Sequence, residues 1–457
     1  MIKSRSMKGI TMRKITICAE KDYSGKTIRE KQLHKQLYQQ SRSLTGPVLH
    51  SFVSWILEEA QKRGIHTLYF LARDGYVLLK IARMLCRERG LAIQCRYLYC
   101  SRASLRMPSY HLIGEEALDL IFSGGYYVTP ERFLERAGIP AAYWKQVMSE
   151  AGIRPVPSGQ CIQQSKSCLQ KNSRRTLGWL QIQRYRSRIA RSKTFQKCLQ
   201  EHSRQSYKTT IGYLRQAGLL AQTHIGIVDS GWTGSMQRSL RQLLEAEGFR
   251  GQMTGFYFGL YQNPKEQRDG EYLSWYFSPK MKKRRQLFFC NNLLECFLSA
   301  PHGMTVDYKL RQGRYEPVLE HTEQGTPIPW ILTQLRGILD GAAMQEKAGK
   351  AYTLKQCARI LGRLMAAPTS KEARVYGNFL FCDDITEGYL YPLAEVGQEK
   401  LLREHLLAVR LWNRRREQKP MPLFWPFGTI ALVRAPLKRS IYWLDACLAQ
   451  WMRTYLL

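Results

Sequence analysis

Short runs of β-branched and aromatic residues alternate along the chain with segments whose apolar residues recur every three or four positions. Runs of the first kind predict strands at residues 66–71, 93–99, 225–229 and 255–261. Segments of the second kind predict helices at 47–63, 76–88 and 235–247. Strands that alternate with helices in this way favour an α/β fold with a parallel sheet.

The same pattern divides the chain into five segments. They are a basic lead-in at 1–44, the first half of an α/β core at 45–114, a basic helical insertion at 115–220, the second half of the core at 221–310, and a mainly helical C-terminal domain at 311–457. We therefore expect a Rossmann-like parallel sheet that is interrupted by helices and followed by more of them.

Polar loops follow three of the predicted strands. The first strand leads into Ala72-Arg73-Asp74-Gly75, the second into Cys100-Ser101-Arg102, and the third reaches Asp229 and then Ser230-Gly231-Trp232-Thr233-Gly234-Ser235. Because the carboxyl ends of parallel strands lie on one edge of a sheet, we expect these loops to converge. Exposed N–H groups at a helix N-terminus, with a carboxylate beside them, are typical of a phosphate site.

Asp229 and Asp74 are therefore the candidate catalytic residues. The residues expected to bind substrate or phosphate are Arg73, Gly75, Ser101, Arg102, Ser230, Gly231, Thr233, Gly234 and Ser235. A structural alternative is that the glycines serve only the turn, that Ser or Thr caps the helix, and that Asp74 caps its own helix.

Weaker candidates lie elsewhere in the chain. Glu295 and His302, with Cys296, are residue types that supply a base or a nucleophile. Mg²⁺ is the candidate cofactor, although no metal ligands are assigned, and Asp383-Asp384 is one place where it could bind together with a phosphate.

The net charge of +34 implies a polyanionic partner, either an anionic membrane surface or another polyanion, with nucleic acid among the candidates. Positive charge is concentrated in the insertion, where residues 184–191 mix arginines with aromatic and apolar side chains. A merely solvated basic surface is the alternative. Tryptophans among the arginines of the C-terminal tail, including Trp412, Trp443 and Trp451, suit either a membrane surface or core packing.

The twelve cysteines form no Cys-x-x-Cys pair, which argues against structural zinc and suits a reducing compartment. No apolar run reaches the length of a membrane span. We expect a cytoplasmic protein, with a peripheral location at the inner face of the membrane as an option.

The 228–235 phrase, Val-Asp-Ser-Gly-Trp-Thr-Gly-Ser, resembles the signature of the phosphoribosyltransferase family. In that family, two adjacent acids hold ribose hydroxyls and a Thr-Gly turn wraps the 5′-phosphate. Ser230 stands here in place of the second acid. The resemblance implies that Asp229 contacts the sugar, that the 72–75 loop grips pyrophosphate, and that the core is phosphoribosyltransferase-like.

A wider resemblance, over residues 45–430, is to an uncharacterised bacterial family associated with haloacid-dehalogenase-type hydrolases in surface polysaccharide gene clusters. The phrases that carry it are 70–76, 99–102, 228–235 and Ala300-Pro301-His302-Gly303-Met304. It implies a phosphorylated sugar or nucleotide sugar as ligand, in cell-surface polysaccharide biosynthesis.

Three functions remain open from the sequence. The first is glycosyl or phosphoribosyl-type transfer to or from a phosphorylated sugar. The second is a haloacid-dehalogenase-like phosphohydrolase, although that mechanism needs Asp-x-Asp after the first strand and places Ala72 where the nucleophile should stand. The third is a non-catalytic module that binds polyanions or a membrane surface.

Overall fold

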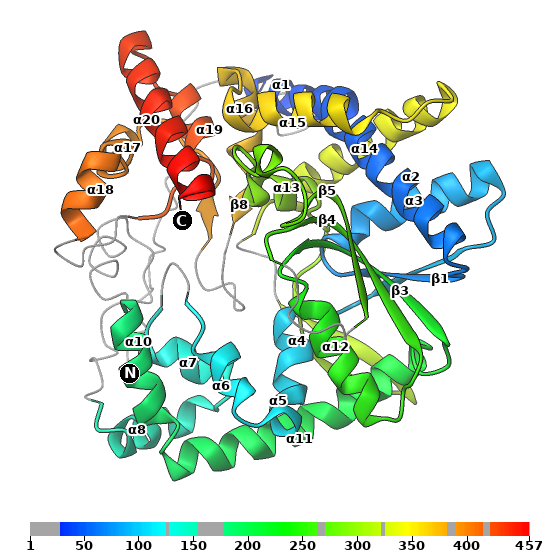
Figure 1. Cartoon of the computed structure of the whole chain (residues 1–457), viewed down its shortest axis with the longest axis vertical. Coiled ribbons are helices and arrows are strands. Elements are labelled where there is room, and N and C mark those ends of the chain that lie inside the picture. The colour runs from blue at the N-terminus through cyan, green and yellow to red at the C-terminus, as the bar shows by residue number, and fades with distance from the viewer. Residues whose placement is uncertain are drawn as a thin grey trace, which may run out of the picture.

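An all-parallel sheet of five strands forms the centre of the protein (Figure 1). The computed structural model describes residues 28–124, 128–153, 177–262, 270–320, 325–381, 390–414 and 421–456. The strand order is β2-β1-β3-β4-β5, an order found in doubly wound α/β sheets. The strands are β1 (Thr67–Leu71), β2 (Gln94–Leu98), β3 (His224–Trp232), β4 (Gln252–Leu260) and β5 (Glu271–Phe277). The expectation of an α/β protein with a Rossmann-like parallel sheet is confirmed.

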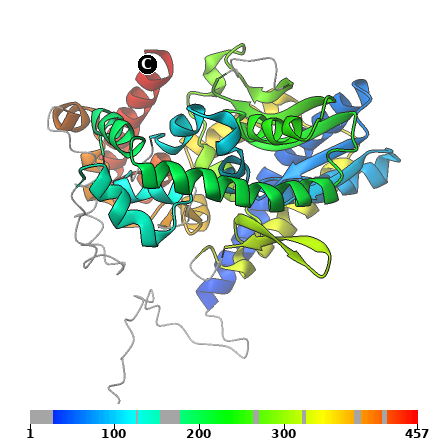
Figure 2. The same cartoon turned by 90° about the horizontal axis from the view of Figure 1, so that it is seen from below.

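Helices cover both faces of the sheet because its side chains alternate between two apolar clusters. Leu68 and Phe70 of β1 pack on one face with α2 (Gly46–Lys62) and α3 (Gly75–Arg89). Tyr69 and Leu71 pack on the other face with α11 (Lys193–Gln216) and α12 (Ser235–Ala246). The long α11 helix crosses the molecule beside α12 (Figure 2).

The segment between β2 and β3 is helical, as the sequence predicts, and no strand occurs in its described residues. Its helices upstream of α11, except the first, bury a separate apolar cluster that includes Phe133, Ile189 and, from the start of α11, Phe195. They are α4 (Arg102–Arg106), α5 (Tyr110–Ile113), α6 (Glu116–Ile121), α7 (Pro130–Arg136), α8 (Ala141–Glu150) and α10 (Trp179–Ile189). Residues 154–176 of the predicted basic insertion lie outside the described residues.

The chain after β5 is mostly helical, apart from two small antiparallel pairs. The pairs are β6 (Thr305–Arg311) with β7 (Arg314–Leu319), and β8 (Leu380–Phe381) with β9 (Tyr391–Pro392). The helices are α13 (Asn291–Phe297), α14 (Ile328–Lys347), α15 (Leu354–Ala366), α16 (Ser370–Tyr376), α17 (Glu399–Glu404), α18 (Leu407–Arg414), α19 (Pro426–Ala431) and α20 (Pro436–Tyr455).

Apart from α18, these C-terminal helices share one apolar cluster with the face of the sheet that α2 and α3 cover. Residues 28–45, which the sequence assigns to the basic lead-in, form α1 (Ile28–Gln40) and a π-helical turn (Ser41–Thr45) that pack on α14. The Tyr38 hydroxyl donates to Asp340 at 2.6 Å. The first and last described segments therefore complete the same core.

Two features differ from the sequence prediction. The third strand does not end at Asp229 but continues to Trp232, because residues 229, 231 and 232 pair with β4. Gly231 permits this pairing with a φ of +116°, and a Cβ there would lie 2.3 Å from the Gly259 carbonyl oxygen. The strand β5 and the β6–β7 hairpin were not predicted, since both lie in or beside a dense aromatic region without clear alternation.

No helix in the described part of the chain is both long and apolar enough to cross a membrane.

Gly75 allows α3 to begin directly against β1. A Cβ at this position would lie 2.6 Å from the carbonyl carbon of Phe70 and 2.9 Å from its Cβ. We predict that Gly75→Ala lowers the free energy of unfolding by about 1–3 kcal/mol, because backbone atoms must move.

Denaturant unfolding followed by circular dichroism measures this change. Gly362→Ala in α15 is the matched control, because a Cβ there meets no atom within 4 Å. In a helix interior this substitution stabilises by roughly 0.5–1 kcal/mol. Equal midpoints for the two variants would contradict the close approach of α3 to β1.

Candidate anion site at the carboxyl edge of the sheet

The strand order reverses direction between β1 and β3. The chain passes from β1 to β2 on one side, and from β3 to β4 and β5 on the other. In sheets of this kind, the loops that follow the two adjacent strands diverge at such a position. Ligands bind there, outside the carboxyl ends of the two strands. Asp74 follows β1 by three residues, and Asp229 follows Val228, the residue that pairs with Phe70 of β1. Asp74, in the loop after β1, and Asp229, near the carboxyl end of β3, therefore both lie at the reversal.

Asp74 is joined to the β3 segment through Ser230, whose side chain hydrogen-bonds its carboxylate. Burial raises the pKa of Asp74, and this hydrogen bond together with the nearby Arg73 and Arg102 opposes the rise. Asp74 occupies the N-cap position of α3, but its side chain makes no capping hydrogen bond. The structural alternative of a helix cap is therefore wrong for Asp74.

Asp229 accepts a hydrogen bond from the Ser230 amide at 2.9 Å. Burial, and next the negative charge of Asp74, raise the pKa of Asp229 to about 7. The two acids interact closely, so at neutral pH they carry less than two full negative charges between them. Both residues nevertheless keep intermediate solvent exposure, so they remain accessible to a ligand.

Arginines lie on the α4 side of this acidic pair. Arg102 is exposed and acts electrostatically on both aspartates. One helical turn later, Arg106 donates from Nη2 to the Ser235 hydroxyl at 3.0 Å, while its Nε is buried without a hydrogen-bond partner. Within the described ranges, no carboxylate lies within 4 Å of either guanidinium. Burial, and next Arg102, lower the pKa of Arg106 to about 10, which indicates a site that favours an added negative charge.

The N-terminus of α12 faces the same arginines. Gly234 occupies its N-cap with a φ of +68° and supplies no side-chain cap, so a serine or threonine cap is not the role of this loop. The Thr233 amide donates to the Gly231 carbonyl at 3.2 Å and is used within the turn. The first-turn amides of a helix have no intrahelical partner and attract anions. Ser235 is the contact between this terminus and Arg106.

Ser101 holds α4 in place, and its hydroxyl is not open to a ligand. Its buried hydroxyl accepts from the Ser104 amide at 3.1 Å and donates to the Thr305 carbonyl at 2.6 Å, which caps α4 and ties it to β6. Ser101 therefore fixes the direction in which Arg102 and Arg106 leave the sheet edge. Gly75, in turn, contributes its close backbone approach to β1.

The weaker candidates lie around the acidic pair. Glu295 accepts from the indole of Trp232 at 2.6 Å. His302 shares a 2.8 Å hydrogen bond with the Tyr97 hydroxyl, and burial, opposed by a hydrogen bond to Gly303, lowers its pKa, with Arg73 adding to the decrease. Glu295 and His302 are therefore each linked to a strand of the sheet through an aromatic side chain, Trp232 and Tyr97 respectively.

Cys296 is buried on α13, and burial holds the pKa of its thiol well above the usual value. The thiol therefore stays protonated, which does not suit a nucleophile.

Two carboxylates alone make a sparse metal site. No group of three histidine, cysteine, aspartate or glutamate side chains in the described residues is arranged to hold a metal ion. Mg²⁺ commonly binds through one or two carboxylates together with substrate phosphates and water. Asp74 and Asp229 fit that arrangement, whereas Asp383 and Asp384 lie outside the described residues.

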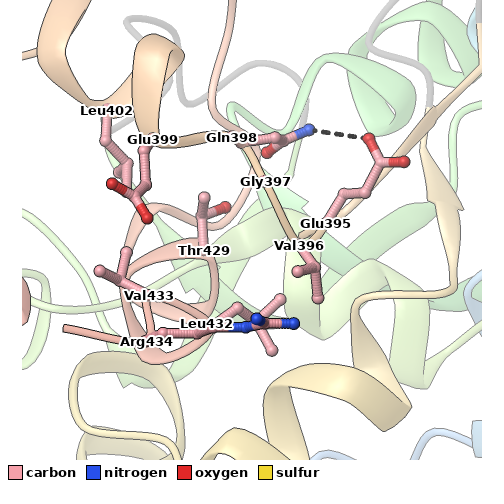
Figure 3. A pocket seen from close by; sticks show the side chains of 10 residues that line it. All are labelled: Glu395, Val396, Gly397, Gln398, Glu399, Leu402, Thr429, Leu432, Val433 and Arg434. Carbon is pink, nitrogen blue, oxygen red and sulfur yellow. Dashed lines mark hydrogen bonds between the residues drawn. The ribbon is translucent and has the colours of Figure 1, made fainter.

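A separate pocket of about 330 Å³ lies among the C-terminal helices (Figure 3). Its wall includes Gln398, which donates to Glu395 at 3.4 Å, and Arg434 on the far side of the opening. None of its lining residues is among those that the sequence singled out.

Arg106 is the contributor that sequence reasoning missed. It lies four residues after Arg102, a spacing that puts both on one side of a helix, but the five-residue helix that carries them is too short to leave a periodic pattern. Its significance comes from contact with Ser235, which is 129 residues away in sequence.

No protein-family model matches the sequence, and no curated protein matches it.

The raised pKa of Asp229 makes stability depend on pH. Folded Asp229 binds its proton more tightly than an ordinary aspartate of pKa 3.8, so its own contribution to stability is lost as pH rises from about 4 to 7. We predict that the stability of Asp229→Asn relative to wild type increases over this range and reaches a gain on the order of 2–4 kcal/mol above pH 7.

Urea unfolding at a series of pH values tests this prediction. Glu88→Gln, at an exposed position of α3, is the control and should follow the wild-type curve. A difference in stability between Asp229→Asn and wild type that stays constant from pH 4 to 8 would show that the carboxylate is not disfavoured.

Proposed function

We propose that this protein binds a phosphorylated sugar or nucleotide sugar at the 229–235 loop and acts as a transferase in bacterial cell-surface polysaccharide biosynthesis. The observation that carries the proposal is the meeting of Asp74 and Asp229 with Arg102, Arg106 and the N-terminus of α12 at one edge of the sheet. The resemblance to the polysaccharide-cluster family supplies the biological setting. The strand-to-helix phosphate loop supports a phosphoribosyltransferase-like core.

Each part of the site has a chemical role in this proposal. The partly buried guanidinium of Arg106 and the first-turn amides of α12 hold a phosphate. Asp229, with a pKa of about 7, exchanges a proton with a sugar hydroxyl near neutral pH, or holds that hydroxyl directly. Arg73 and Arg102 neutralise a leaving diphosphate. Rate enhancement then comes chiefly from positioning and from charge stabilisation.

A cation adds one further element. Mg²⁺ bound between the two aspartates and the phosphate oxygens would supply positive charge to the leaving group. It would also remove the repulsion between Asp74 and Asp229.

We predict that Arg106→Gln weakens the binding of phosphoribosyl diphosphate or of a nucleotide sugar about tenfold or more, because a charge-assisted hydrogen bond is lost. Asp229→Ala should also weaken binding. Titration calorimetry against a panel of common sugar phosphates and nucleotide sugars measures the affinities.

Arg87→Gln is the matched control, because it removes the same charge from an exposed position in the last turn of α3. Its affinities should equal those of wild type. If Arg106→Gln and Asp229→Ala leave every affinity unchanged, the site is rejected. Affinity that falls steeply with salt but ignores both variants would point to general polyanion binding.

A phosphohydrolase is the second candidate. It is favoured by the near-neutral pKa of Asp229 beside the carboxylate of Asp74, because one acid can attack phosphorus while the other moves protons. This candidate predicts Mg²⁺-dependent release of inorganic phosphate from sugar phosphates, measured colorimetrically, that disappears in Asp74→Asn. Tight binding without phosphate release would leave the transferase as the better explanation.

A further inference from the structure

The helix α20 presents a stripe of large apolar side chains to solvent. Six of them lie in a row along one side of the helix, with exposed fractions between 42% and 75%. They are Leu437, Ile441, Leu444, Leu448, Trp451 and Tyr455. We call this row the α20 seam.

The opposite side of α20 is held firmly against the protein. Tyr442 is buried there, and the indole of Trp443 donates to the Ala366 carbonyl at 2.9 Å. Asp445, which flanks the seam, accepts from the Leu407 amide at 3.1 Å. The helix lies at the outer edge of the molecule (Figure 1). A surface helix normally buries its apolar side and exposes its polar side. In α20 the apolar seam faces solvent, whereas these polar groups contact the rest of the protein. The seam is therefore available to pack against another apolar surface.

The spacing of the seam identifies the kind of partner. Its members are separated alternately by four and three residues, so they form two series that each recur every seven residues: Leu437, Leu444 and Trp451, and Ile441, Leu448 and Tyr455. Two apolar positions in every seven residues are the pattern of knobs-into-holes packing against another helix. A helix that lies in a membrane surface instead has a broad apolar face and a polar face rich in lysine and arginine.

The charges beside the seam agree with a helical partner. The six flanking positions carry one cation and one anion and are otherwise uncharged; they are Lys438, Asp445 and Met452 on one side and Ser440, Cys447 and Thr454 on the other. The guanidinium of Arg439 is turned to the Val433 carbonyl at 2.9 Å. No row of cations along the seam is available to recognise anionic lipid, and no like charges along it repel a second α20.

We infer that α20 packs in an antiparallel orientation against α20 of a second copy of this chain, forming a symmetric dimer. Twofold symmetry allows one self-complementary seam to serve both partners. The antiparallel orientation places the first turn of α20, with Lys438 and its ion-pair partner Glu399 at 3.6 Å, near the C-terminal end of the partner helix. Twenty residues give a seam of about 30 Å. Covering it on both copies buries on the order of 1,000 Å², the lower bound for a specific interface.

This dimer is expected to be stronger at higher ionic strength. Each chain carries a net charge of +34, so two copies repel each other over long distances, and salt screens that repulsion. Contact between the apolar seams is not weakened by salt. A dimer held by surface ion pairs, or a complex with anionic lipid, would show the opposite dependence.

Light scattering coupled to size-exclusion chromatography of the full chain tests the inference. Wild type should have about twice the chain mass of 53.1 kDa at micromolar concentration, and more so in 0.5 M than in 0.1 M NaCl. Leu448→Glu and Leu448→Lys should each raise the dimer dissociation constant about 30-fold or more, because either charge would be buried at the centre of the seam. The side chain is exposed in the single chain, so both variants should retain the wild-type circular dichroism spectrum.

Leu310→Lys is the matched control, since Leu310 is 57% exposed on the β6–β7 hairpin, away from α20, and this variant should remain dimeric. A wild type that stays monomeric at tens of micromolar overturns the inference. Sedimentation with phosphatidylglycerol vesicles identifies the rival occupant. Vesicle binding that Leu448→Glu weakens and Leu448→Lys preserves, together with a monomeric wild type, would assign the seam to a lipid surface instead. None of these outcomes depends on the anion site.

Discussion

Two carboxylates held close together at the reversal of strand order are the constraint on which the rest of the site depends. Asp74 lies in the loop after β1 and Asp229 near the carboxyl end of the adjacent β3, and burial raises the pKa of each. Burying two carboxylates close together costs folding free energy unless hydrogen bonds or opposite charges compensate it. Ser230 does so locally through a side-chain hydrogen bond to one acid and a backbone hydrogen bond to the other. Arg73 and Arg102 supply opposite charge from the flanks.

Elements that contribute no ligand-binding group nevertheless set this geometry. The short α4 helix is fixed to β6 through Ser101, and Tyr308 of the same strand donates to the Tyr99 carbonyl at 2.7 Å and stacks on Tyr213. The hairpin therefore acts as a brace behind the arginines. Residues more than 200 positions after β2 determine where the arginines that follow β2 are placed.

The sequence pattern predicted those parts of the fold that depend on interactions between residues close together in the sequence. Periodicity located β1 to β4 and the helices α2, α3 and α12, and the polar residues after the strands indicated which edge would carry function. It did not predict that β3 continues past Asp229, because the pairing of Gly231 with Gly259 is a property of two strands together.

The remaining parts of the site depend on contacts between distant segments. Arg106 matters because of Ser235, and Ser101 is committed to Thr305, so neither role is visible in its own neighbourhood of the sequence. The outward direction of the α20 side chains was equally hidden, since an apolar stripe in sequence normally predicts a buried side. A sequence pattern shows which residues share one face of a helix. Only the folded structure shows whether that face is buried or exposed to solvent.

The apolar cluster shared by the sheet and the C-terminal helices makes the two parts interdependent. Phe52 and Val77, beside the sheet, belong to the same packed interior as Trp425 and Tyr376, more than 290 residues later in the chain. During synthesis on the ribosome, all five strands therefore emerge before the residues that cover one of their faces. A nascent chain that stops after β7 exposes this hydrophobic surface, so it is prone to aggregation, and a fragment cut at that point should fold poorly.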